Sequence, residues 1–362
     1  MAFRAEDVAK LFALDGEPML AVPFGHGHIN DTYFVETSRA RKYILQRVNS
    51  TIFPDMEGLM NNIYLITSHI RQKVAENGGD PMREGLTIVE TKDGNRFVTL
   101  DDSFWRCYIY IDNAITMQTT ENPELFRTAG AAFGTFQRQL ADFPAEKLVD
   151  AIPNFHNTPN RFKNFEKARL EDRFNLAKTA REEILFVREN AELCSLLTDK
   201  LTSGELPLRV THNDTKINNV MLDRATGRPL AVIDLDTVMA GLSAYDFGDS
   251  IRSGATYAAE DEPDVDKVKF EIELFDKYAE GFLKECGSVF SKEEVLSLYT
   301  GSVLMTFECG MRFLTDYLEG STYFKTAYPE HNLVRCRTQF ALVKQIMAKK
   351  EEIEAVLLKY WN

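Results

Sequence analysis

One polar segment set between short apolar runs constrains the fold of this 362-residue chain more than any other feature. In residues 208–239, short apolar runs flank a polar loop at 211–219 and a turn that contains Gly227. Apolar runs of strand length separated by such turns are typical of a β-hairpin. We therefore expect strands on both sides of Gly227, with the polar groups at their ends close together.

The polar residues at these strand ends are the types that phosphoryl transfer requires. His212, Asp214 and Asn219 form the pattern H-x-D-x4-N, and Asp234 follows 15 residues after Asn219. This order is close to the catalytic loop and the metal-binding Asp of protein kinases. We predict that Asp214 receives the proton of an acceptor hydroxyl. Asn219 and Asp234 are predicted to hold Mg²⁺ against ATP, with Asp236 as an additional metal ligand.

The alternative interpretation is that Asn and Asp simply occupy turns, where both are common. That interpretation would leave the order of Asp214, Asn219 and Asp234 unexplained. The chain has no Arg directly after His212 and no Phe-Gly after Asp234, which argues against a eukaryotic-type protein kinase.

These motifs resemble those of a known superfamily. The stretches 212–219, 233–236 (Ile-Asp-Leu-Asp) and 245–249 (Tyr-Asp-Phe-Gly-Asp) resemble the aminoglycoside phosphotransferase and choline kinase-like superfamily of small-molecule kinases. Within it, Thr-His-Asn-Asp-Thr-Lys-Ile-Asn-Asn-Val-Met-Leu-Asp at 211–223 is similar to the bacterial N-acetylhexosamine 1-kinases. Those enzymes phosphorylate the anomeric hydroxyl of GlcNAc and GalNAc, which implies the same ATP- and Mg²⁺-dependent reaction here.

The resemblance also implies a fold. We expect an α+β, protein-kinase-like structure of two lobes. The small N-terminal lobe, residues 1–112, would contain an antiparallel sheet and bind the nucleotide. The larger, mainly helical C-terminal lobe, residues 113–362, would carry the catalytic loop and bind the substrate.

A glycine-containing loop lies between two strand-like segments near the N-terminus. Gly25 and Gly27 would let backbone amides approach a phosphate that a Cβ atom would obstruct. Two glycines at this spacing also occur in plain hairpins. The position of the loop, 185 residues before His212, favours a phosphate-binding loop.

The next strand, at 42–48, offers a cation for the phosphates. Arg47 alternates with Tyr43 and Leu45 and so shares a face with them, and we predict that Arg47 binds the phosphates. An exposed edge-strand Arg is the alternative. The helix expected at 55–76 contains Glu57 near its start. We interpret Glu57 as a negative charge that stabilises the helix by its interaction with the helix dipole. A helix partner for Arg47 is therefore not identified.

A helix expected at 292–318 carries a polar stripe. Glu308, Arg312 and Asp316 recur at four-residue spacing and lie on one face. They form either an exposed ladder of ion pairs or part of a sugar site. Guanidinium and carboxylate groups bind hydroxyls by paired hydrogen bonds. Together with the family resemblance, this leads us to predict that Arg312 and Asp316 bind the substrate.

Two further residues complete the predicted sugar site. Tyr323 follows the same helix and would cover the apolar face of the sugar. His156 lies in a segment rich in Pro and Asn, similar to one that stands near the sugar in the N-acetylhexosamine kinases, and would donate to a hydroxyl. A His on a surface loop is the alternative. Asp246 and Asp249 are predicted to support the catalytic loop rather than to react.

Other elements follow from periodicity and turn signals. We expect a hairpin formed by 86–92 and 95–100, a helix at 122–141, solvated charged helices within 160–200, and helices at 265–284 and 333–358.

Composition excludes several classes of partner. The net charge of −13 disfavours binding to nucleic acid or to an anionic membrane. The five cysteines are scattered and indicate reduced thiols rather than disulfides or a zinc site. With no signal-like start and no run of ~20 apolar residues, we expect a cytoplasmic, monomeric enzyme that binds only ATP and a small sugar. A kinase for a cationic acceptor, such as an aminoglycoside or choline, and a nucleotide-binding regulator without turnover are the alternatives.

Overall fold

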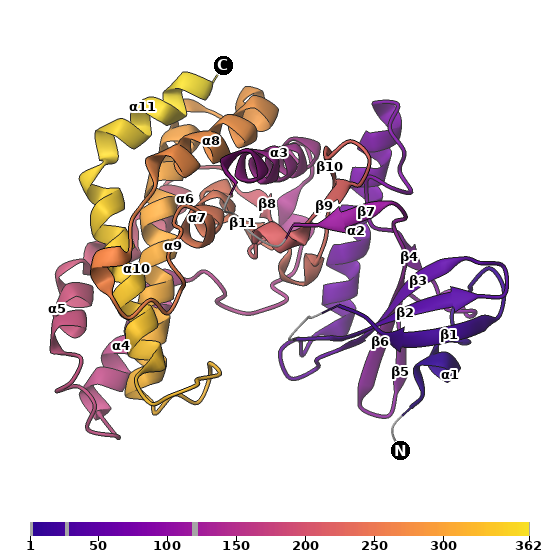
Figure 1. The fold of residues 1–362 in the computed structure, drawn as a ribbon, viewed down its shortest axis with the longest axis horizontal. Helices are drawn as coiled ribbons and strands as arrows, with labels where there is room; N and C mark the ends of the chain where they lie inside the picture. The colour runs from indigo at the N-terminus through magenta and orange to yellow at the C-terminus, as the bar shows by residue number, and fades with distance from the viewer. Residues whose placement is uncertain (1–2, 26–28, 118–121, 362) are drawn as a thin grey trace. The chain divides into compact units, whose positions relative to one another are not determined.

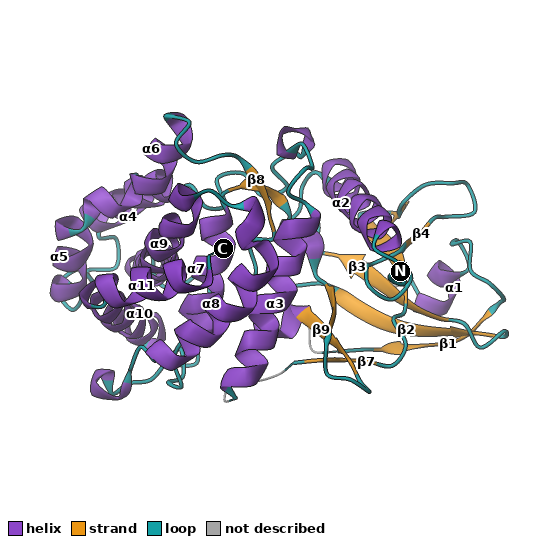
Figure 2. Cartoon of the chain, turned by 90° about the horizontal axis from the view of Figure 1, so that it is seen from above, coloured by secondary structure: helices purple, strands orange, loops and turns teal. Residues whose placement is uncertain are grey.

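The computed structural model describes residues 3–25, 29–117 and 122–361 (Figure 1). The chain forms two compact units. The first contains Met1–Ile115, Asp142–Pro153 and Met221–Met239, and the second contains Thr116–Ala141, Asn154–Val220 and Ala240–Asn362. Figure 2 shows that most strands belong to the first unit and most helices to the second. The secondary structure confirms the predicted α+β class, with an antiparallel sheet in the N-terminal region and a mostly helical C-terminal part.

A six-stranded antiparallel sheet forms the body of the first unit. Its order is β1-β2-β3-β6-β4, and β5 also pairs with β6. The strands are β1 (Pro18–Pro23), β2 (Asp31–Thr37), β3 (Lys42–Val48), β4 (Ile88–Val89), β5 (Val98–Leu100) and β6 (Ser103–Ile109). Because side chains alternate along a strand, Tyr43 and Leu45 of β3 share one buried face. This face packs against Val8 in helix α1 (Ala5–Ala9) and against Phe12, which follows the helix.

The region expected to form a hairpin at 86–100 differs from the prediction. The turn is present, and Gly94 adopts a left-handed backbone with φ +79°. However, β4 and β5 each pair with β6. The longer strand β6 can form more hydrogen bonds than either short strand. The turn at Gly94 therefore connects two strands that both pair with β6.

Helix α2 (Met56–Glu76) follows β3 and matches its predicted span. Asp55 caps its start by accepting from the N–H of Gly58. In the middle of the helix, the buried side-chain amide of Asn62 donates to the carbonyl oxygens of Val149 and Val238. Helix α2 is thereby tied to later segments of the same unit.

The helix α9 (Lys292–Leu318) is the centre of the second unit. It packs against α7, α10 and α4, and α3 packs against α8 (Figure 1). The remaining helices are α3 (Pro123–Gln139), α4 (Thr158–Glu171), α5 (Arg181–Glu189), α6 (Leu196–Thr202), α7 (Ser243–Gly254), α8 (Ile272–Cys286), α10 (His331–Ala348) and α11 (Lys350–Tyr360). The charged region 160–200 thus forms parts of several helices. Among the described residues, no helix is both long and apolar enough to cross a membrane.

Short strands carry the polar segment that dominates the sequence. Strands β9 (Val220–Asp223) and β10 (Pro229–Val232) pair, and Gly227 between them has φ +69°, so the predicted hairpin is confirmed. Strand β9 also pairs with β7 (Ala114–Thr116), and β8 (Arg209–Thr211) pairs with β11 (Met239–Gly241). The polar loop begins where β8 ends.

Candidate active site

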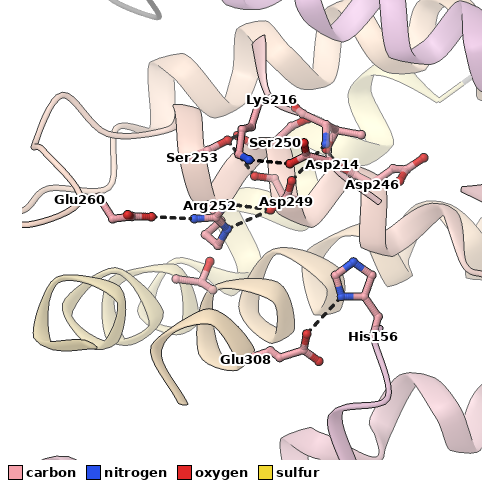
Figure 3. A network of polar contacts seen from close by, with 12 residues as sticks. His156, Asp214, Lys216, Asp246, Asp249, Ser250, Arg252, Ser253, Glu260 and Glu308 are labelled. Atoms are coloured by element: carbon pink, nitrogen blue, oxygen red, sulfur yellow. Dashed lines mark hydrogen bonds and ion pairs between the residues drawn. The ribbon is translucent and has the colours of Figure 1, made fainter. Parts of the chain in front are cut away.

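The carboxylate of Asp214 is held by two neighbours in the loop after β8, and Figure 3 shows its contact with Lys216. Its Oδ1 lies 2.7 Å from the Nζ atom of Lys216. Asn219, in the one-turn helix η3 (Ile217–Asn219), donates from Nδ2 to the Asp214 backbone oxygen at 2.9 Å and to Oδ2 at 3.3 Å. Because its nitrogen faces Asp214, the amide oxygen of Asn219 is the end that can accept a cation. The structure therefore brings Asp214 and Asn219 together, and adds Lys216, which the sequence reasoning missed.

His212 fixes the start of this loop from inside the protein. Its ring is fully buried and meets the rings of Phe133 and Phe136 edge-on, at centroid distances of 5.7 and 5.8 Å. Its Nδ1 accepts from the backbone N–H of Asp214 at 3.3 Å. The next residue, Asn213, has φ +65°. The His of the motif thus orients the backbone of the predicted base.

Asp246, at the start of α7, supports the same loop. Its buried carboxylate accepts from the backbone N–H groups of His212 at 2.9 Å and Asn213 at 2.8 Å, and from the side chain of Gln137 at 2.9 Å. Burial raises the pKa of Asp246, although the two backbone N–H donors act in the opposite direction. These contacts agree with the predicted supporting role.

Asp249 supports the loop one turn further along α7 (Figure 3). It accepts from the N–H of Thr215 at 3.1 Å and pairs with Arg252 at 2.9 Å. Burial by itself would raise the pKa of Asp249, but the charges of Arg252 and Lys216 outweigh it and the pKa is lowered. Asp249 is therefore held as an ion, and the acidic motif on α7 fixes the catalytic loop by its charges and hydrogen bonds.

Asp234 belongs to the first unit, whereas Asp214 and Asn219 belong to the second. Asp234 is exposed and has a left-handed backbone, with φ +62°, at the start of the one-turn helix η4 (Leu235–Thr237). Carboxylate and amide oxygens are the ligands that Mg²⁺ prefers in proteins. Asp234 in the first unit and Asn219 in the second therefore each carry an oxygen donor of a type that Mg²⁺ accepts.

Asp236 does not behave as an additional metal ligand. Its carboxylate is buried, with Oδ1 2.5 Å from Nη1 of Arg106 and Oδ2 2.7 Å from Nδ2 of Asn30. Both oxygens are therefore occupied by protein groups. The prediction that Asp236 binds the metal is therefore corrected. Asp236 has a structural role instead, because it is buried and its carboxylate contacts Arg106 and Asn30.

The predicted phosphate-binding cation forms an ion pair at the surface. Arg47 is exposed and pairs with Asp31 at 2.8 Å. Its neighbour Gln46 points to the opposite face, where it contacts Arg106. The buried strand cation is thus Arg106, and its acid is Asp236 rather than a Glu of helix α2. The sequence did contain a signal for this buried cation, because Arg106 is the single charged residue in the apolar segment 104–109. A charged residue that is buried in such a strand is normally paired.

Only part of the predicted glycine loop is described. Gly25 is exposed and has φ +77°, a conformation that residues with a side chain rarely adopt, and a Cβ built there would meet nothing within 4 Å. These features leave room for a ligand close to the backbone. Gly27 lies outside the described residues.

His156 and Glu308 form a buried pair in the second unit (Figure 3). The His156 Nδ1 atom lies 3.1 Å from Oε1 of Glu308, and the hydroxyl of Thr158 donates to Oε2 at 2.5 Å. His156 is 9% exposed, and within the described part of the chain its Nε2 has no hydrogen-bond partner. The ring is therefore held by Glu308 at Nδ1, while Nε2 is buried without a hydrogen-bond partner among the described residues.

Arg161 and Arg312 lie near one another and near Tyr323. Burial lowers the pKa of the Arg161 guanidinium, and the charge of Arg312 lowers it further. Arg161 donates to the carbonyl oxygen of Phe155 at 3.1 Å, and Arg312 lies over the ring of Phe324 at 5.5 Å. Arg161 was expected on a solvated helix face. No sequence signal distinguished it from its charged neighbours.

Asp316 organises the loop that carries Tyr323 and is not available to a sugar. Its buried carboxylate accepts from the backbone N–H groups of Thr322, Tyr323 and Phe324 at 2.8–3.0 Å, and from Nδ2 of Asn332 at 2.7 Å. We predicted that Asp316 contacts the sugar directly, but its carboxylate instead positions the loop that carries Tyr323. Tyr323 itself is 74% exposed.

Several solved structures share the fold of this chain. The chain is similar to an aminoglycoside phosphotransferase from Alicyclobacillus acidocaldarius, with 14% identity, a TM-score of 0.62, and 99% of this chain and 98% of that chain covered. It is similar to amicoumacin kinase, solved with AMP-PNP and Ca²⁺, with 14% identity, a TM-score of 0.56, and coverage of 96% and 91%. A choline kinase from Cryptosporidium parvum has 13% identity, a TM-score of 0.56, and coverage of 95% and 93%.

At these identities the structural similarity shows the fold alone. The model of the phosphotransferase enzyme family matches residues 21–280, which is more than half of the chain and includes the whole catalytic loop. The chain therefore belongs to the phosphotransferase enzyme family.

Proposed function

We propose that this phosphotransferase transfers the γ-phosphoryl group of ATP to the anomeric hydroxyl of an N-acetylhexosamine, GlcNAc or GalNAc, and forms the sugar 1-phosphate. The observation that carries the proposal is the Asp214 carboxylate, held between Lys216 and Asn219 on a loop that α7 supports. Family membership supports the reaction class. The similarity of 211–223 to the N-acetylhexosamine 1-kinases supports the acceptor.

Transfer is direct and needs no covalent enzyme intermediate. Asp214 orients the acceptor hydroxyl and takes its proton, while Lys216 and Asn219 keep the carboxylate in one direction. Asn219 and Asp234 would hold Mg²⁺, which neutralises charge on the triphosphate when bound. An anomeric hydroxyl is more acidic than an ordinary alcohol, so positioning by Asp214 contributes more than its basicity.

The nucleotide is assigned to residues 1–112, and the catalytic loop and acceptor to residues 113–362. Gly25 supports a loop that approaches phosphate closely. Amicoumacin kinase, which shares the fold, was solved with AMP-PNP and Ca²⁺, and this supports a nucleotide bound with a divalent cation here.

The charges around the predicted sugar site favour a neutral acceptor over a cationic one. Two neighbouring guanidinium groups, Arg161 and Arg312, would repel an aminoglycoside or choline. They would bind the hydroxyl and carbonyl oxygens of an N-acetylated sugar. Tyr323 offers an exposed aromatic face.

The test is an assay of ADP formation with Mg-ATP and GlcNAc, GalNAc, glucose, choline or kanamycin, with the phosphorylated position identified by NMR. A 1-phosphate formed fastest from the N-acetylated sugars would support the proposal. ADP with only choline or kanamycin would refute the acceptor but keep the reaction class. No ADP with any acceptor would favour a regulator that binds nucleotide without turnover.

A variant connects this activity to the catalytic loop. Asp214→Asn should lower kcat by about 100- to 10,000-fold, because the carboxylate both orients the hydroxyl and accepts its proton. The matched control is Asp199→Asn, a change at an exposed Asp in α6. Near-normal turnover by Asp214→Asn would contradict the assignment of the base.

A further inference from the structure

A buried carboxylate joins two distant segments of the first unit. The side chains of Asp236 and Arg106 are 5% and 2% exposed, and their atoms Oδ1 and Nη1 are 2.5 Å apart. The other oxygen of Asp236 accepts from Nδ2 of Asn30 at 2.7 Å. Burial by itself would lower the pKa of Arg106, but the charge of Asp236 and other neighbouring groups outweigh burial, and the net pKa is raised.

Each partner of Asp236 is itself held by the sheet. Nε of Arg106 donates to Oε1 of Gln46 at 3.0 Å, and Nε2 of Gln46 donates to the hydroxyl of Thr32 at 3.0 Å. Oδ1 of Asn30 accepts from the backbone N–H of Asn49 at 3.1 Å. Hydrogen bonds therefore connect β2 through β3 to Arg106 in β6, and the ion pair with Arg106 continues the connection to Asp236. From Asp236 two further hydrogen bonds lead through Asn30 to the end of β3.

Asn30 and Asp236 each lie close in sequence to a residue that the proposed function assigns to nucleotide or metal binding. Asn30 lies directly before β2, in the connection that contains Gly25. Asp236 lies two residues after Asp234, on the one-turn helix that Asp234 begins. Asp234 has φ +62°, a conformation that a residue with a side chain keeps only where its surroundings impose it.

We propose that Asn30 and Arg106 are positioning residues for phosphoryl transfer. They hold Asp236, and Asp236 fixes the turn that aims the Asp234 carboxylate at the nucleotide-bound metal. This inference rests on the proposed function, since it assumes that Asp234 meets a metal–nucleotide complex.

A purely stabilising role is the competing explanation. A buried ion pair adds little to stability compared with apolar residues of similar volume, because both charges lose their hydration. Polar groups that orient a metal ligand, by contrast, typically change metal affinity or activity by about 10- to 100-fold when removed. The two explanations therefore differ in what they predict for metal-dependent binding.

The first experiment measures binding of AMP-PNP by calorimetry, with Mg²⁺ and with EDTA. Asn30→Ala should raise the Kd for AMP-PNP about 10-fold in Mg²⁺ and leave the Kd in EDTA unchanged. The matched control is Asn61→Ala in α2, which removes a hydrogen bond to Arg96 in the same unit. Equal loss with Mg²⁺ and with EDTA, or no loss in either, would overturn the inference.

The second experiment removes both charges together, because Arg106→Met alone would leave a buried carboxylate unpaired. Arg106→Met combined with Asp236→Asn keeps an acceptor for Asn30 and should melt close to the wild-type temperature. Its Kd for AMP-PNP should rise about 10-fold or more in Mg²⁺ only. A double variant that binds Mg·AMP-PNP like the wild type would overturn the inference.

The wild-type protein separates this inference from the proposed function. Binding of Mg·AMP-PNP by the wild type without turnover of any acceptor would refute the proposed reaction, while the variants would still decide the inference. A wild-type protein that binds AMP-PNP in neither condition would overturn both.

Discussion

Lys216 lies two residues after Asp214 and places its Nζ atom 2.7 Å from Oδ1 of that carboxylate. Burial by itself would lower the pKa of Lys216, but the charge of Asp214 outweighs it and the pKa is raised. The lysine therefore stays protonated throughout the neutral range. It is paired with the predicted base, and it is half-exposed, so a ligand can reach it.

Removing this cation should slow the chemical step. Lys216→Met should lower kcat by about 100-fold, because the charge both fixes Asp214 and stabilises negative charge that develops during transfer. Steady-state kinetics with saturating ATP will measure the change. Lys200→Met is the matched control, since Lys200 pairs with Glu205 on the surface. Unchanged kcat for Lys216→Met would show that the ion pair has no catalytic role.

The support from α7 should be necessary for an ordered catalytic loop. In Asp246→Asn an amide nitrogen would face one of the N–H donors of His212, Asn213 and Gln137. An unsatisfied buried donor costs about 1–3 kcal/mol, so the melting temperature should fall and kcat with it. Thermal denaturation and the ADP assay together test this. Full activity at a normal melting temperature would contradict the supporting role.

The loop after α9 should affect the acceptor rather than the nucleotide. Asp316→Asn replaces one acceptor oxygen by a donor and releases part of the segment that presents Tyr323. We expect the KM for GlcNAc to rise about 10-fold, which corresponds to about 1.4 kcal/mol of lost binding, with the KM for ATP unchanged. Equal changes in both KM values would point to general unfolding instead.

Stability should fall in acid partly through Glu308. Burial by itself would raise the pKa of Glu308, but its hydrogen bond and charge interaction with His156 outweigh burial, and the pKa lies below 4.5. The unfolded chain therefore binds this proton more readily than the folded chain does. Its contribution to stability is present above pH 4.5 and is lost as the pH falls through the folded pKa.

Glu308→Gln tests this contribution, because the amide keeps hydrogen-bonding groups for His156 and Thr158 but does not titrate. Melting temperatures measured between about pH 6 and pH 3 should depend less steeply on pH in the variant. Parallel curves for the two proteins would show that Glu308 does not contribute.

Close packing of α7 on α9 gives a test that leaves all charges unchanged. A Cβ built on Gly301 would lie 2.0 Å from the carbonyl oxygen of Ala244, beside the start of α7. Gly301→Ala should therefore destabilise the protein by about 1–3 kcal/mol. At Gly287 the nearest atom would be 3.7 Å away, and Gly287→Ala should be tolerated. Denaturant unfolding will measure the free energies of both variants.

Local patterns in the sequence were sufficient for many features. The 27 residues of α9 match the predicted helix, and the strands around Gly227 form the predicted hairpin. Both depend on periodicity and on turn chemistry, which act over a few residues. The supporting role of Asp246 was predicted in the same way, from its place at a helix start.

The roles of Arg47, Asp236 and Asp316 were not predictable by such patterns. Alternation correctly placed Arg47 on the face of Tyr43 and Leu45, but it could not show that this face packs on the N-terminal helix. The sequence around a carboxylate such as that of Asp236 is the same whether its oxygens bind a metal or pair with an arginine. Only the packing of the chain distinguishes the two cases.

The sequence by itself determined the phosphotransferase motif, because Asp214, Asn219 and Asp234 are fixed by short spacings along the chain. The tertiary structure alone decided which buried charges are paired. Arg106 and Asp236 are 130 residues apart, and burial of both charges is tolerated because the fold brings them to 2.5 Å. Such a pairing is a property of the packed unit, since neither residue has a local reason to be buried.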